Sequence, residues 1–125
     1  MKKLYEKKLK NSIVISSFKH DLLSPFKKNG FKTGMLFESE ILKNRPLKQI
    51  FSVLKHRPWS VNIPVNIFTE GLPFLIKLFA VTVKFLKVKF IFWTVNSDVQ
   101  YNAVKDFAYA VITDDVEGML KLRDN

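Results

Sequence analysis

The chain has 125 residues and is 47% apolar with 12 Phe, which is enough for one domain with a buried core and too apolar for a disordered chain. It has no cysteine, which excludes a disulfide framework, thiol catalysis and cysteine-ligated zinc, and which fits a reducing cytoplasm. The net charge is +10, and residues 1–60 hold 14 Lys/Arg against 4 Asp/Glu, whereas residues 61–125 hold 7 of each.

The first part of the chain predicts a helix, a strand, a turn and a second strand. Met1 to Lys10 is a basic helical segment that is not followed by the apolar stretch of a signal peptide. Ser12 to Phe18 is a β-branched run and predicts a strand. His20 to Lys28 predicts a helix or turn, and Asn29-Gly30 breaks the chain before a short strand over Lys32 to Phe37.

The middle of the chain predicts a helix, a strand and a second helix. Pro46 suits a first helical turn, and four apolar residues follow at helical spacing: Leu47, Ile50, Phe51 and Leu54. Val61 to Ile67 alternates like a half-buried strand, in which Pro64 predicts a bulge or a missing ladder bond. Thr69, Glu70 and Pro73 predict a helix start, and that helix runs to about Leu86. Lysines interrupt the apolar stretch from Leu72 to Phe92, so no transmembrane segment is expected.

The last part of the chain predicts two strands, each followed by a helix. Phe90 to Asn96 (FIFWTVN) and Val111 to Asp115 (VITDD) are the strands. Ser97 or Asp98 caps one helix and Asp115 the other. The apolar faces of these helices are expected to comprise Val99, Ala103, Val104 and Phe107 in the first and Met119, Leu120 and Leu122 in the second.

About five strands that alternate with helices predict right-handed βα units and a mostly parallel α/β sheet. A closed parallel barrel needs eight units and about 250 residues. We therefore expect residues 1–125 to form a single domain that is an open sheet or a partial TIM-type (β/α) barrel, which this chain alone does not close.

Several segments resemble the barrel of the glycerophosphodiester phosphodiesterase family, in the same order. Ile13 to Phe18 (IVISSF) resembles its fourth strand, Thr33 to Leu36 (TGML) its fifth, and Val61 to Val65 falls where the sixth belongs. Trp93 to Asn96 (WTVN) resembles the seventh strand, and Ile112 to Asp114 (ITD) the eighth. The resemblance spans nearly the whole chain. It implies that the chain corresponds to the C-terminal portion of the family's barrel.

The resemblance implies a reaction that hydrolyses glycerophosphodiesters to glycerol 3-phosphate and an alcohol, with a divalent metal such as Mg²⁺ or Ca²⁺. The family holds the metal with carboxylates on its first three strands, and two histidines there act as general acid and base. Those motifs and the family's Glu-x-Lys motif do not precede Ile13. We therefore expect the chain to be a truncated or split form that is inactive and binds no cofactor by itself.

The resemblance also implies two substrate-binding residues, Trp93 and Asn96. Trp93 corresponds to the family tryptophan that walls the glycerol phosphate pocket, although a packed strand aromatic is an equally good interpretation. Asn96 could orient a substrate hydroxyl, but Asn before Ser-Asp is also ordinary at a helix start. Thr113 and Asp114 are expected to bond the turn after the last strand.

Other polar residues give weaker signals. Ser16 and Ser17 lie in no nucleophile elbow, so we reject a nucleophile role. For His20 and His56 we favour a position on the surface or a role in compensating a helix dipole. The acidic residues Asp114, Asp115 and Glu117 favour capping over metal binding.

Partners follow from the missing half and from the charge. A polypeptide that supplies the N-terminal half-barrel, or self-association, would cover the two strand edges left open, and the glycerophosphodiester would bind only to a completed barrel. The alternative function is a non-catalytic basic module for anionic lipid or a protein partner. No nucleic-acid motif accompanies the charge, so nucleic acid is not expected. These hypotheses place the chain in the cytoplasm, with peripheral membrane association left open.

Overall fold

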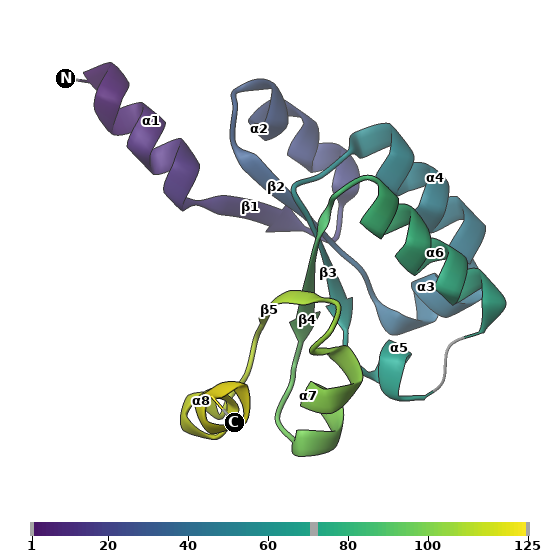
Figure 1. The fold of residues 1–125 in the computed structure, drawn as a ribbon. Coiled ribbons are helices and arrows are strands. Elements are labelled where there is room, and N and C mark those ends of the chain that lie inside the picture. The colour runs from purple at the N-terminus through teal and green to yellow at the C-terminus, as the bar shows by residue number, and fades with distance from the viewer. Residues whose placement is uncertain (1, 71–72, 125) are drawn as a thin grey trace.

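In the computed structural model, residues 2–70 and 73–124 are described, and their strands form one parallel sheet (Figure 1). The five strands of this part of the chain follow each other in the order β1-β2-β3-β4-β5. They are β1 (Val14–Ser17), β2 (Lys32–Leu36), β3 (Ser60–Pro64), β4 (Lys89–Trp93) and β5 (Ala108–Val111). A doubly wound sheet reverses its strand order, whereas a barrel does not. The order thus confirms the predicted α/β partial barrel.

Helices connect and follow the strands (Figure 1). They are α1 (Lys2–Ser12), the 3₁₀ helix η1 (His20–Leu23), α2 (Ser24–Lys28), α3 (Ser39–Asn44), α4 (Pro46–His56), α5 (Asn66–Thr69), α6 (Phe74–Phe85), α7 (Asp98–Val104) and α8 (Val116–Asp124). Helices α4 and α6 pack side by side against one face of the sheet, and α1 projects away from it (Figure 1). No helix of the described residues is long and apolar enough to cross a membrane.

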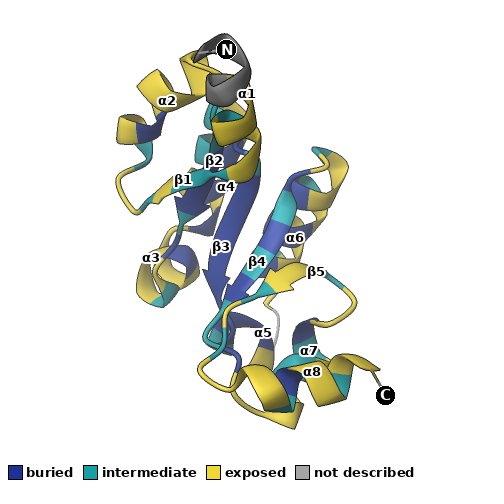
Figure 2. Cartoon of the chain, turned by 90° about the vertical axis from the view of Figure 1, so that its left-hand side faces the viewer, coloured by how far each residue is buried: buried dark blue, intermediate teal, exposed yellow. Residues whose placement is uncertain are grey.

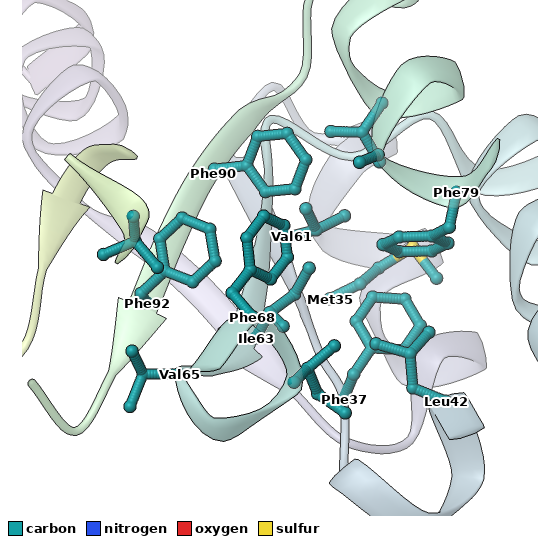
Figure 3. Packing of buried hydrophobic residues seen from close by; sticks show 14 of the residues in the cluster. Met35, Phe37, Leu42, Val61, Ile63, Val65, Phe68, Phe79, Phe90 and Phe92 are labelled. Carbon is teal, nitrogen blue, oxygen red and sulfur yellow. The ribbon is translucent and has the colours of Figure 1, made fainter. Parts of the chain in front are cut away.

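The core lies between the sheet and these helices, and aromatic rings fill much of it (Figure 3). Phe37, which follows β2, meets Phe79 of α6 edge to face, with ring centroids 5.4 Å apart. Phe68 of α5 lies 4.9 Å from Phe92, and Phe92 stacks on Phe90 within β4 at 5.6 Å. This burial of apolar surface is the main stabilising contribution to the fold.

The strands begin and end at other residues than predicted. The segment Val61 to Ile67 is wrong in length, because the strand ends at Pro64 and Ile67 lies in α5. Successive residues of β3 are all buried, rather than alternate ones, and β3 lies in the middle of the sheet between β2 and β4 (Figure 2). Pro64 causes no bulge, since it is the last strand residue. The VITDD prediction is wrong as well: β5 ends at Val111, and the polar residues that follow form a turn.

The structure also corrects three helix predictions. Helix α4 turns Ile50 and Val53 into the core, whereas three residues of its predicted apolar stripe are exposed: Leu47, Phe51 and Leu54. The helix predicted from Thr69 starts at Phe74 instead, and Thr69 closes α5. Helix α3 lies where no helix is predicted.

The two C-terminal helices bury less than their sequences suggest. Val99 of α7 and Leu120 of α8 are exposed, whereas Val104 and Met119 are buried as predicted. Both helices are short and lie beside β5, the last strand of the sheet. Other described residues therefore pack against only one side of each helix. The predicted caps are confirmed, since Ser97 Oγ accepts from Gln100 N and Asp115 Oδ1 accepts from Gly118 N.

The sheet has two edges without a neighbouring strand in the described part of the chain, β1 and β5. Figure 2 shows that β3 is buried throughout, whereas β1 and β5 carry exposed residues. Unpaired backbone groups along such edges accept further strands. The predicted edges are therefore confirmed at both ends of the sheet.

Candidate functional site

The candidate site lies where the five parallel strands end. The carboxyl ends of parallel strands share one edge of the sheet, which is where α/β barrels bind their substrates. Phe18 follows β1, Glu38 follows β2 and its flanking Phe37, Trp93 ends β4, and Asn96 and Asp114 follow β4 and β5. Residues that are distant in sequence are thereby brought to one edge.

Trp93 lies at the carboxyl end of β4, the fourth of the five strands. Its ring meets that of Phe18 edge to face, with centroids 6.3 Å apart, so side chains that follow β1 and end β4 touch across the edge. The Trp93–Thr94 peptide bond is cis. Trp93 Nε1 is buried and, alone among the buried side-chain polar atoms of the described residues, has no hydrogen-bond partner. An unpaired buried N–H costs about 1–3 kcal/mol, so this group is available to an acceptor that enters the site.

A small hollow of about 160 Å³ opens between the ends of β1 and β2. Phe18, His20 and Glu38 are among the residues that line it. His20 Nε2 lies 2.8 Å from the carbonyl oxygen of Leu36, and the imidazole packs 4.9 Å from the ring of Phe37. The His20 side chain thus contacts the backbone at the end of β2, and this contact is structural.

The side chain of Asn96 is bound to the turn after β5. Its Oδ1 accepts from Asp114 N at 2.9 Å and from Thr113 Oγ1 at 3.1 Å, and its Nδ2 donates to Asp114 Oδ2 at 3.1 Å. Backbone bonds from Val95 N to Ile112 O continue the same junction. The amide therefore joins the segments that follow β4 and β5, and one of the two Nδ2 N–H donors has no bond among those described.

The acidic residues after β5 are engaged in local structure. Asp115 caps α8, and Asp115 N donates to Thr113 Oγ1 at 2.9 Å. The predicted bond to the turn after the last strand is made by Thr113, whereas Asp114 bonds Asn96 after β4. Within residues 7–70 and 73–124, no three His, Asp or Glu side chains come together where they could hold a metal ion.

The remaining candidates lie in ordinary surroundings. Ser17 Oγ accepts from Lys19 N at 3.0 Å, which is a turn bond. His56 ends α4 and lies 3.5 Å from Asp21 Oδ1. Burial lowers the pKa of His56 below its usual value, against the opposing effect of Asp21.

Sequence reasoning missed Phe18 and Glu38 as site residues. Phe18 lies at the end of the Ser-Ser-Phe segment, and the signal was its place directly after a strand. It also missed a polar pair on the inner face of the sheet, where Ser60 Oγ donates to Asn62 Oδ1 at 2.9 Å. Both side chains are buried although polar, which only the packing of neighbouring strands determines.

Comparison with known proteins finds similarity to a solved structure. No protein-family description matches the chain, and no curated protein sequence matches it. Among solved structures, the chain is similar to a glycerophosphodiester phosphodiesterase from Thermotoga maritima, with a TM-score of 0.70 and 29% sequence identity. The match covers 88% of this chain and 46% of that chain. The family resemblance indicated by the sequence is thus confirmed, and the chain spans about half the length of the structure it matches.

Proposed function

We propose that this chain forms the substrate-side half of a glycerophosphodiester phosphodiesterase barrel and hydrolyses glycerophosphodiesters only when a second segment completes that barrel. One observation carries the proposal: five sequentially ordered parallel strands with two open edges superpose on about half of such an enzyme. The missing segment is placed by the family resemblance at the first three strands, which hold the metal ligands and the acid and base.

In this proposal Trp93 and Phe18 wall the pocket for the glycerol phosphate group. Their edge-to-face contact lies at the carboxyl end of the sheet, and Trp93 Nε1 offers a buried donor to a phosphate or hydroxyl oxygen. Asn96 acts as a positioning residue, because its amide holds the β4–β5 junction beside Trp93. Binding groups at this edge would orient the substrate towards the catalytic segment.

The described residues do not fit the divalent metal by themselves, since they provide no set of three ligands. The metal would therefore be held by the completing segment. We assign it no ligand in this chain.

The test is reconstitution with the part of the Thermotoga maritima enzyme that precedes the matched region. We expect the two polypeptides to co-purify and to release glycerol 3-phosphate from glycerophosphocholine when Mg²⁺ or Ca²⁺ is added, while each alone is inactive. A folded but inert complex would refute the catalytic role. Failure to associate would refute barrel completion, and activity of this chain alone would refute the division of roles.

Replacing Trp93 tests its place in the pocket. In the reconstituted complex, Trp93→Ala should raise KM, or lower kcat/KM, by about tenfold or more through loss of a wall of the pocket. Trp59→Ala is the matched control. Trp59 directly precedes β3 and packs against Tyr109 and Lys32, so it lies at the amino end of the sheet and not at the carboxyl end that forms the candidate site. Equal effects of the two substitutions would indicate general destabilisation and remove Trp93 from the site.

A further inference from the structure

The outer face of helices α4 and α6 carries two exposed apolar stripes. On α4 the stripe consists of Leu47, Phe51 and Leu54, at spacings of four and three residues. On α6 it consists of Phe74, Leu78, Val81 and Phe85, at the same spacings. These side chains are between 38% and 84% exposed, and each set lies along one side of its helix.

The two stripes lie on neighbouring helices. Helices α4 and α6 pack side by side (Figure 1). Each of them buries residues other than those of its stripe. Ile50 and Val53 face inward on α4, and Phe79 and Val83 face inward on α6. The stripe residues are therefore separate from the residues that pack in the core. Seven exposed large apolar side chains on two adjacent helices indicate a binding surface.

Lysines border both stripes. Lys48 and Lys55 each follow a stripe residue of α4, and Lys77 precedes one of α6, so each lies about 100° round its helix from that residue. Lys84 also precedes a stripe residue, but its Nζ lies 5.2 Å from the centre of the Phe107 ring and is not counted with them. Neither helix contains an Asp or Glu. Each stripe is therefore accompanied on its own helix by lysine and by no acidic residue.

This charge pattern selects the partner. A second copy of the chain placed on this face would bring lysines against lysines, and the chain as a whole carries a net charge of +10. An anionic surface would pair with the same lysines. Helices that lie in a membrane interface bury Phe and Leu at the acyl boundary while Lys side chains extend to the phosphates.

We propose that the α4–α6 face docks this protein on an anionic phospholipid bilayer. The docking surface consists of the two stripes and the three lysines Lys48, Lys55 and Lys77, and it lies on the helices rather than on the residues that follow the strands. The sequence places the excess of basic residues in the first half of the chain, which contains α4, whereas α6 lies in the second half. The proposal goes beyond barrel completion and stands independently of it.

The experiment is co-sedimentation of the full chain with phosphatidylcholine vesicles, with and without phosphatidylglycerol. We expect binding to the anionic vesicles, weakened by salt, and little binding to the neutral ones. Each lysine near an anionic surface contributes about fivefold to the partition coefficient, so K48Q/K55Q/K77Q should lose about 100-fold. The control K7Q/K8Q/K121Q removes the same charge from α1 and α8 and should retain most of the binding.

The apolar stripes are tested with a matched pair of variants. Leu47→Ser with Val81→Ser removes one residue from each stripe and should weaken binding about tenfold. Leu22→Ser with Val99→Ser removes equally exposed residues of the same types from η1 and α7 and should leave binding unchanged. All four positions are exposed, and circular dichroism checks that each variant folds.

Three results would overturn the proposal. The first is absence of binding to anionic vesicles at low salt. The second is equal loss in the test and control variants, because that would make the attraction a property of total charge. The third is a dimer in light scattering that Leu47→Ser with Val81→Ser dissociates, because a second copy would then occupy the face.

Discussion

The clearest test of the candidate site is to replace Asn96 by Ala, because its amide makes three hydrogen bonds within the fold whereas the family resemblance implies a role in substrate binding. The substitution removes three side-chain hydrogen bonds to Thr113 and Asp114. All lie near the surface, so each contributes about 0.5–1 kcal/mol, and their sum is about 2 kcal/mol. The substitution should lower the free energy of local opening at the junction between β4 and β5 by that amount.

Hydrogen–deuterium exchange measures this local change. Val95 N donates to Ile112 O at 2.9 Å and Ile112 N donates to Phe92 O at 2.8 Å, so these amides report on the junction. A loss of about 2 kcal/mol corresponds to about 30-fold faster exchange in β5 and α8. Exchange in the central strand β3 should remain unchanged, since Asn96 makes no contact there among the bonds described.

The matched control is Asn102→Ala, which removes the same group from an exposed position of α7. It should leave exchange in β5 unchanged. The reasoning would be refuted if Asn96→Ala left β5 protected while it weakened substrate binding in the reconstituted enzyme. That result would assign the amide to the substrate, as the family resemblance first suggested.

Two further predictions concern the stability of the chain. Gly34→Ala should lower the urea midpoint by the equivalent of about 1–2 kcal/mol, because the new Cβ would lie 2.8 Å from the buried Ser60 Oγ; adding Ser60→Ala should restore part of the loss, and a neutral Gly34→Ala would contradict the pairing of β2 with β3. Since burial lowers the pKa of folded His56 below the unfolded value, the unfolded chain binds more protons and stability should fall as pH drops below about 6.5. Urea midpoints at neutral and mildly acidic pH should show this fall in the natural chain and a smaller one in His56→Gln; equal falls in both would contradict it.

The sequence by itself determined the alternation of strands and helices and the family resemblance. Both depend on local patterns: β-branched runs predict strands, and Pro46, Ser97 and Asp115 mark helix starts that the structure confirms. Short segments such as WTVN also carry recognisable residue types at strand ends. These features require no knowledge of distant contacts.

Tertiary structure alone decided which faces are buried and which side chains meet. Periodicity shows that α4 is amphipathic, but only its packing beside α6 turns Val53 inward and leaves Phe51 exposed. In the same way, only the parallel sheet brings Phe18 to Trp93 and Asn96 to Asp114. A local pattern fixes the direction of a side chain relative to its own element, whereas its neighbour depends on how the elements are assembled.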